Sequence, residues 1–184
     1  VGLIGELLGC RVVEIGGGYD KCACGVDELD FNACINHKAI NFTEQLAQVN
    51  PNGIDVYFEN VDNKVLDAVI PLLNPKARVQ VCGLVSQYNV TKLPDGPDRI
   101  NWLMGQILRK KIKMQGFIVF DDVSHLYPDF LMEMGGWISS GKIKYREKII
   151  DGLENAYNAF TGLLKGENFG KCVNRVGQQT KEMI

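Results

Sequence analysis

Short apolar runs alternate along this chain with stretches of helical periodicity. Five runs have the character of strands, at Arg11–Ile15, Ala33–Asn36, Ile54–Phe58, Ala77–Cys82 and Met114–Phe120. Helical patterns lie between and after them, at 20–29, 42–49, 64–73, 101–110 and 127–140, and Pro71 should end or bend the third. This alternation predicts an α/β fold with a doubly wound parallel sheet. Right-handed crossovers then place the loops after the strands at one edge, where such sheets bind ligands.

The first element of the chain is a helix, with no strand before it. Val1–Leu8 has helical composition and is followed by Gly9, a residue that commonly ends helices. In a nucleotide-binding βαβ unit, the first strand and its glycine-rich loop precede this helix, so both would lie upstream of Val1. That strand is central in the order 3-2-1-4-5-6, and its absence would leave two unpaired inner edges. We expect the chain to be part of a longer polypeptide, or to pair with another chain.

The stretch Cys10–Lys21, CRVVEIGGGYDK, contains a motif suited to an anion. A short strand is followed by three glycines, Gly16 to Gly18, and then by a helix. Glycines permit close approach to the backbone, and a helix N-terminus offers free N–H groups. Lys21 adds a positive charge, and no acidic residue stands at the strand end to bind a ribose 2′-hydroxyl. The motif favours a 2′-phosphorylated nucleotide such as NADP; the alternative is an ordinary turn with Asp20 as N-cap.

Residues suited to ligand binding also follow the later strands. The amide of Asn60 could contact a ribose or carboxamide, and Gly83 lets a planar ring lie close to the backbone. Ser86 and Tyr88 supply hydroxyl groups, and Phe117–Val119 lies at the end of another strand. The same residues are equally well explained by turns and by aromatic packing.

Composition excludes several classes of partner. The formal net charge of -2 gives no reason to expect nucleic acid or an anionic membrane surface. No apolar run reaches about 18 residues, and no leader sequence is evident, so we expect a cytoplasmic protein. Zinc is the sharpest alternative, because Cys22, Cys24, Cys34 and His37 are of suitable types. On a helix, however, Cys22 and Cys24 lie about 200° apart, so we expect no metal site.

An ordered set of motifs resembles a known family. These are CRVVEIGGGYDKC and the segments Gly53–Val61, Val81–Asn89, Gly116–Phe120, Gly141–Tyr145, Gly152–Ala156 and Asn168–Lys171. The set is similar to the zinc-independent medium-chain dehydrogenases/reductases, in the group of prostaglandin reductases, leukotriene B4 dehydrogenases, plant double-bond reductases and curcumin reductase. The resemblance implies a Rossmann-type domain over 1–142, truncated at its N-terminus. It also implies that 143–184 returns to a catalytic domain that this chain does not include.

The resemblance further implies a set of NADP(H)-binding positions. Lys21 and Gly17 match the site of the 2′-phosphate, and His37 stands where the family usually has a tyrosine that covers it. The remaining positions match the lining of the cofactor or its nicotinamide end: Asn60, Cys82, Phe117, Val119 and Asn168, with Gly83 and Ser86 from the same loops. Tyr88 matches a tyrosine near the nicotinamide ribose that is proposed as proton donor.

The implied reaction is NADPH-dependent reduction of the carbon–carbon double bond of an α,β-unsaturated ketone or aldehyde. We expect a homodimer, and no activity from this portion alone. Three alternatives stay open: a nucleotide-binding module without turnover, a quinone oxidoreductase of the same superfamily, and a different doubly wound enzyme such as a methyltransferase. Lys21 counts against the last, which would need an acidic ribose contact.

Overall fold

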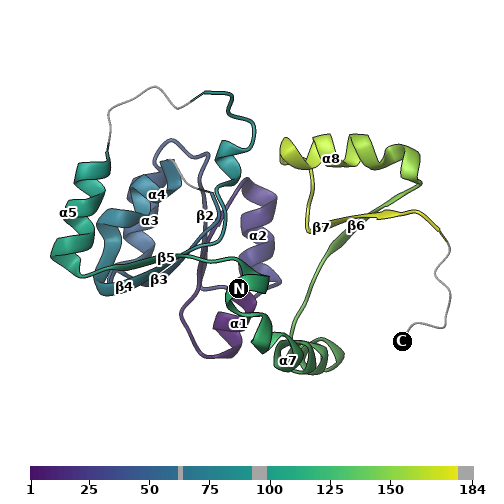
Figure 1. Cartoon of the computed structure of the whole chain (residues 1–184), viewed down its shortest axis with the longest axis horizontal. Coiled ribbons are helices and arrows are strands. Elements are labelled where there is room, and N and C mark those ends of the chain that lie inside the picture. The colour runs from purple at the N-terminus through teal and green to yellow at the C-terminus, as the bar shows by residue number, and fades with distance from the viewer. Residues whose placement is uncertain (62–63, 93–98, 178–184) are drawn as a thin grey trace.

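The structure is a computed structural model that describes residues 1–61, 64–92 and 99–177 (Figure 1). The strands are β1 (Val13–Gly16), β2 (Ala33–Asn36), β3 (Ile54–Glu59), β4 (Leu73–Val81), β5 (Lys113–Gly116), β6 (Glu147–Asp151) and β7 (Lys171–Arg175). The helices are α1 (Gly2–Leu7), α2 (Tyr19–Asp27), α3 (Phe42–Val49), α4 (Lys64–Val69), α5 (Ile100–Lys110), α6 (Val119–Asp122), α7 (Tyr127–Ser139) and α8 (Ala156–Leu164). Parts of the predicted loop 83–98 and of the C-terminal segment 143–184 lie outside the described residues.

The predicted α/β architecture with parallel strands is confirmed. β1 pairs with β2, and β3, β4 and β5 form a second sheet in that order, with every pairing parallel. A helix connects each strand to its neighbour, as the alternating pattern requires. Among the described residues, no strand pairs with the inner edge of β1 or with that of β3. The two sheets are therefore separated where the first strand of the order 3-2-1-4-5-6 would lie.

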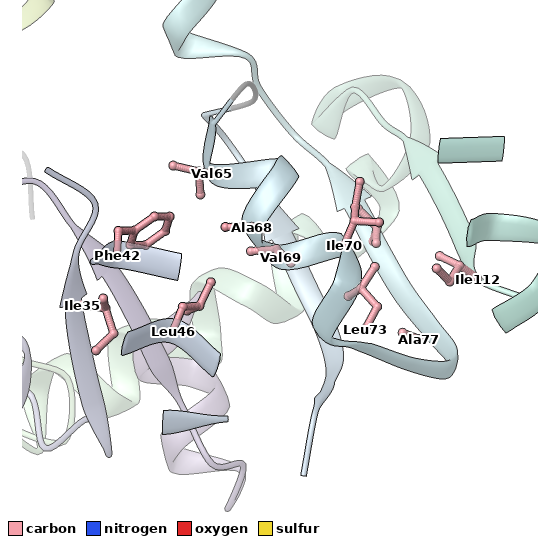
Figure 2. Packing of buried hydrophobic residues seen from close by; sticks show 11 residues of the cluster. Ile35, Phe42, Leu46, Val65, Ala68, Val69, Ile70, Leu73, Ala77 and Ile112 are labelled. Atoms are coloured by element: carbon pink, nitrogen blue, oxygen red, sulfur yellow. The ribbon is translucent and has the colours of Figure 1, made fainter. Parts of the chain in front are cut away.

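A single hydrophobic core joins the two sheets on one face. Its buried residues come from β2, α3, α4, β4 and the segments beside them: Ile35, Phe42, Leu46, Val65, Ala68, Val69, Ile70, Leu73, Ala77, Val79 and Ile112. Figure 2 shows Phe42 of α3 pointing toward Val65 and Ala68 of α4. Because α3 packs on β2 and against α4, this layer of helices bridges the gap between the sheets.

The helix predicted at 64–73 is shorter than expected. α4 ends at Val69, a 3₁₀ turn follows at Ile70–Leu72, and β4 begins at Leu73. The prediction that Pro71 ends or bends the helix is confirmed, since proline cannot donate the next helical hydrogen bond. Lys110 stabilises the turn, because its Nζ donates to the carbonyls of Pro71 and Leu73 at 2.8 Å each. The start predicted for the next strand, Ala77, was therefore four residues late.

The strand predicted at Met114–Phe120 is wrong in its second half. β5 ends at Gly116, and Val119 begins the short helix α6. The physical reason is local, because the Asp122 carboxylate accepts a hydrogen bond of 2.7 Å from the Ile118 N–H and so holds the helix start. Ile118 and Phe120 are 63% and 70% exposed, so this apolar run is not the interior of a sheet.

The C-terminal strands form a separate parallel pair. β6 and β7 are connected through α8, and no other described strand pairs with them (Figure 1). The segment before β6 is held to the C-terminal end of α2, where Arg146 makes two hydrogen bonds of 2.8 Å to the Glu28 carboxylate.

Gly170 allows β7 to start, and its substitution should open this pair. Gly170 has φ +77°, and a Cβ there would lie 2.8 Å from the carbonyl carbon of Arg146. That carbonyl oxygen accepts the first hydrogen bond of the pair, from Lys171 N–H at 2.9 Å. We expect Gly170→Ala to destabilise β6–β7 by about 2 kcal/mol, from backbone strain plus the clash. Gly166→Ala is the matched control, because Gly166 has φ +75° and a Cβ there would meet no atom within 4 Å. Gly166→Ala should lower the stability of this pair by about 1 kcal/mol, from backbone strain alone.

Amide hydrogen exchange of Ile149 and Val173 measures this opening directly. These two residues are paired in the β6–β7 register. Equal protection losses in the two variants would show that the Arg146 contact contributes nothing.

Candidate functional site

The glycine turn after β1 has the geometry of a cradle. β1 ends at Gly16, and α2 begins at Tyr19 with Gly18 as its N-cap at φ +138°. The alternative in which Asp20 caps the helix is wrong, because Asp20 already lies inside α2. A Cβ on Gly17 would lie 3.2 Å from Nε2 of His37, so the absence of a side chain lets the imidazole ring pack close to the glycine turn.

Positive charges converge on His37, which follows β2. Burial lowers the pKa of His37, and the charges of Lys38, Lys64 and Lys21 lower it further. The backbone N–H of His37 donates to the carbonyl of Gly16 at 3.1 Å, which holds the end of β2 against the glycine turn. We call this group the anion seat: Gly17, Lys21, His37, Lys38 and Lys64. Three lysines around a partly buried imidazole favour a ligand with negative charge.

Sequence reasoning identified part of the anion seat and missed the rest. Gly17, Lys21 and His37 were predicted, and the structure brings them together. Lys38 and Lys64 were not predicted. Lys38 directly follows His37, and Lys64 is the first residue of α4. Since parallel strands end at the same edge, Lys38, the second residue after β2, could have been included from the topology alone.

A second group of predicted residues gathers where β3 and β4 end. The N–H groups of Cys82 and Gly83 both donate to the carbonyl of Glu59, at 2.9 and 3.2 Å. A Cβ on Gly83 would lie 3.3 Å from Oδ1 of Asn60, so the absent side chain keeps this amide close to the β4 loop. Ser86 N–H donates to the Val61 carbonyl at 3.2 Å. The structure therefore places Asn60, Cys82, Gly83 and Ser86 side by side.

The buried side chain of Glu59 holds the backbone that follows β3. The residue is 1% exposed, and its Oε1 accepts the N–H of Val61 at 2.5 Å. A buried carboxylate that binds the backbone fixes the direction in which Asn60 leaves β3. The sequence IDVYFEN reads as an apolar strand with a polar end, so nothing in it marked Glu59 as buried.

The predicted residues Phe117, Val119 and Tyr88 lie in three different surroundings. Phe117 packs edge-on against Phe58 of β3, with ring centroids 6.2 Å apart, so it stands beside the β3 end. Val119 is 47% exposed and belongs to α6 rather than to a strand. Tyr88 follows the 3₁₀ turn Val85–Gln87 and is 66% exposed.

Asn168 lies between α8 and β7, in the C-terminal unit formed by β6, α8 and β7. It lines a hollow of about 210 Å³ between α8 and the β6–β7 pair, together with residues such as Asn158 and Cys172. Its Nδ2 donates to the Gly170 carbonyl at 3.0 Å. The contacts of Asn168 are thus with the loop before β7, and not with the glycine turn.

Two of the cysteines considered as zinc ligands, Cys22 and Cys34, lie close together at the end of β1. A Cβ on Gly16 would lie 3.0 Å from the sulfurs of both Cys22 and Cys34, so these two thiols lie on the same side of β1. Burial raises the pKa of Cys24, and the charge of Glu28 raises it further. Over residues 1–61, 64–92 and 99–177, no group of three His, Cys, Asp or Glu side chains is arranged to hold a metal ion. In the same ranges, every helix is too short or too polar to cross a membrane.

Comparison with known proteins agrees with this fold. Residues 2–135 match the family described as zinc-binding dehydrogenase. The NADPH-dependent curcumin reductase of Escherichia coli (strain K12) is 56% identical over 176 residues, which are 96% of this chain and 51% of that protein. The 2-alkenal reductase (NADP(+)-dependent) of Nicotiana tabacum is 38% identical over 180 residues, 97% of this chain and 51% of that protein.

A solved structure is also similar to this chain in sequence and fold. CurA in complex with NADPH from Vibrio vulnificus has 59% sequence identity and a TM-score of 0.93, over 97% of this chain and 53% of that one. The chain thus spans about half the length of the relatives it matches. The family match covers most of the chain, and the fold agrees with it throughout. The chain belongs to the zinc-binding dehydrogenase family, within the medium-chain reductases, in the group that includes curcumin reductase.

Proposed function

We propose that the full-length protein is an NADPH-dependent reductase of carbon–carbon double bonds in α,β-unsaturated ketones or aldehydes, and that this chain supplies its cofactor-binding part. The observation that carries the proposal is the anion seat, where the His37 ring packs close to Gly17 and the charges of three lysines act on this ring. This cradle suits the 2′-phosphate that distinguishes NADP(H) from NAD(H). The relatives named as NADPH-dependent curcumin reductase and 2-alkenal reductase support the same reaction.

Each group of site residues has a proposed role. Lys21 and His37 bind the 2′-phosphate, with Gly17 giving access. Asn60, Cys82, Gly83 and Ser86 line the path of the cofactor at the ends of β3 and β4. Phe117 and Val119 face the nicotinamide, and Asn168 reaches its phosphate end once the full-length protein brings the C-terminal unit into place.

The protein's part in the chemistry is orientation and proton supply. The bound cofactor supplies a hydride to the β-carbon of the substrate. Negative charge then develops on the carbonyl oxygen of the substrate as an enolate, and a hydroxyl donor near that oxygen stabilises the charge. We assign this donor to Tyr88, whose exposed phenol stands after the β4 loop. Protonation of the α-carbon completes the reduction.

Turnover by the full-length protein tests the proposal. We expect NADPH oxidation, followed by its absorbance, only when an enone or enal is present, with little oxidation of NADH. Tyr88→Phe should lower kcat by about tenfold with KM nearly unchanged. The loss should stay modest for general-acid catalysis because water can reach so exposed a position.

Other outcomes identify the alternatives. NADPH binding without turnover of any enone would support a binding module, and reduction of quinones alone would support a quinone oxidoreductase. A kcat that is unchanged in Tyr88→Phe would show that another group donates the proton. The division at residues 142 and 143, a homodimer and a cytoplasmic location stay predictions.

A further inference from the structure

A carboxyl group is packed between β1 and α2, next to the anion seat. Glu14 of β1 is opposite Cys34 of β2 in the parallel register. Its Oε2 lies so near Gly25 of α2 that a Cβ on that glycine would overlap with it. Gly25 is buried, and it is the absence of a side chain there that leaves room for the carboxyl. Glu14 is therefore held under the helix that carries Lys21.

This carboxyl has little to stabilise its charge. Within the described part of the chain, Glu14 Oε2 is buried and has no hydrogen-bond partner. Burial raises the pKa of Glu14, while a hydrogen bond from Cys34 and the charge of Lys21 act in the opposite direction. Burial also raises the pKa of the Cys34 thiol, which keeps it protonated as a donor to Glu14. Lys21 is the cation whose charge acts on Glu14.

Lys21 belongs to the anion seat, and its charge also acts on this carboxyl. Lys21 and Gly25 are four residues apart on α2, so both lie on the helix face turned toward β1. The charge of Lys21 lowers the pKa of Glu14 on one side and that of His37 on the other. The other titratable groups near Glu14 are the thiols of Cys22, Cys24 and Cys34. The charge of Lys21 therefore acts both on the carboxyl of Glu14 and on the site where a phosphate would bind.

We propose that Glu14 competes with the 2′-phosphate for Lys21 and thereby sets the affinity and selectivity of the anion seat. This inference rests on the proposed function, because it assumes that the seat takes a 2′-phosphate. Without a nucleotide, the Glu14 carboxylate is the internal counter-ion of Lys21. A bound phosphate brings like charge close to a poorly solvated carboxylate, so binding costs free energy unless Glu14 takes up a proton. Binding of the phosphate and protonation of Glu14 are then coupled.

Calorimetric titration of the full-length protein with 2′,5′-ADP and with 5′-AMP tests this competition. At pH 8, we expect Glu14→Gln to bind 2′,5′-ADP about tenfold tighter than the wild type, because the like charge is gone. Its affinity for 5′-AMP should change less than about twofold. Glu44→Gln is the matched control, since Glu44 is an exposed carboxylate in the first turn of α3. It should leave both affinities unchanged.

Proton uptake by the wild type gives a second measurement that needs no Glu14 variant. Titrations in buffers of different ionisation enthalpy should show protons taken up with 2′,5′-ADP and not with 5′-AMP. Affinity for 2′,5′-ADP should rise as pH falls from 8 to 6. Lowering the pH favours the protonated forms of both Glu14 and His37, and His37→Gln isolates the part that belongs to Glu14.

The outcomes separate the two proposals. If the wild type prefers 2′,5′-ADP but Glu14→Gln binds it no tighter, the competition is wrong while the cofactor assignment stands. If the wild type does not prefer 2′,5′-ADP over 5′-AMP, the proposed function itself fails. If Glu14→Gln does not fold, the absence of proton uptake by His37→Gln on binding 2′,5′-ADP overturns the inference on its own.

Discussion

Replacing Phe42 with alanine should lower the free energy of unfolding by about 3–5 kcal/mol, the range for a buried phenylalanine. Phe42 is 1% exposed and begins α3, in the core shared with Ile35 of β2 and Val65 of α4. The lost ring removes apolar contacts and leaves a cavity that the surrounding helices cannot fill fully. Because this core bridges the two sheets, the loss should weaken β1–β2 and β3–β4–β5 together.

Urea unfolding followed by circular dichroism measures this effect, and Ile40→Ala is its control. Ile40 is two residues away and fully exposed, so its truncation should change stability by less than about 0.5 kcal/mol. A loss of similar size in both variants would mean that burial of the Phe42 ring is not the cause. If only β3–β4–β5 lost protection from hydrogen exchange, the helical layer would not connect the sheets.

Replacing Lys21 with alanine should weaken NADPH binding by about 10–100-fold, the range for one lost charge-assisted hydrogen bond of about 1.5–3 kcal/mol. Lys21 acts on His37 from α2, while Lys38 acts from the segment after β2 and Lys64 from the start of α4. These two lysines should keep part of the affinity. Binding of NADH should be nearly unchanged, because it has no phosphate at this position.

Titration of the full-length protein with NADPH and NADH gives both affinities. Lys113→Ala is the control. Lys113 is an exposed lysine on β5, so its replacement removes the same charge from another element. An equal loss of NADPH binding in both variants would point to net charge as the cause. An equal loss of NADPH and NADH binding in Lys21→Ala would place Lys21 on a part common to the two cofactors.

Most helices and strands were predictable because their signals are local. The bounds predicted for β2 and α3, Ala33–Asn36 and 42–49, are those of the structure. In both segments a periodic apolar face agrees with the turn residues on either side. The unpaired inner edges of β1 and β3 also followed from the order of the elements in the described residues.

The errors occurred where side-chain contacts override the apolar pattern. The run Phe117–Phe120 is apolar like a strand, yet the Asp122 carboxylate turns it into a helix start. β4 begins early because the Lys110 ammonium, on α5, holds the carbonyls of the preceding turn. Neither contact can be read from composition, because each depends on where a charged side chain comes to lie after folding.

For the anion seat, the sequence by itself determined the glycine turn, Lys21 and the parallel order of the strands. These are properties of neighbouring residues, and glycine backbone freedom and helix capping act over a few positions. Only the tertiary structure decided that Lys64 joins the seat and that Glu14 lies beneath Lys21. The reason is that charges interact through space, so their effect on one another depends on distances that packing alone sets.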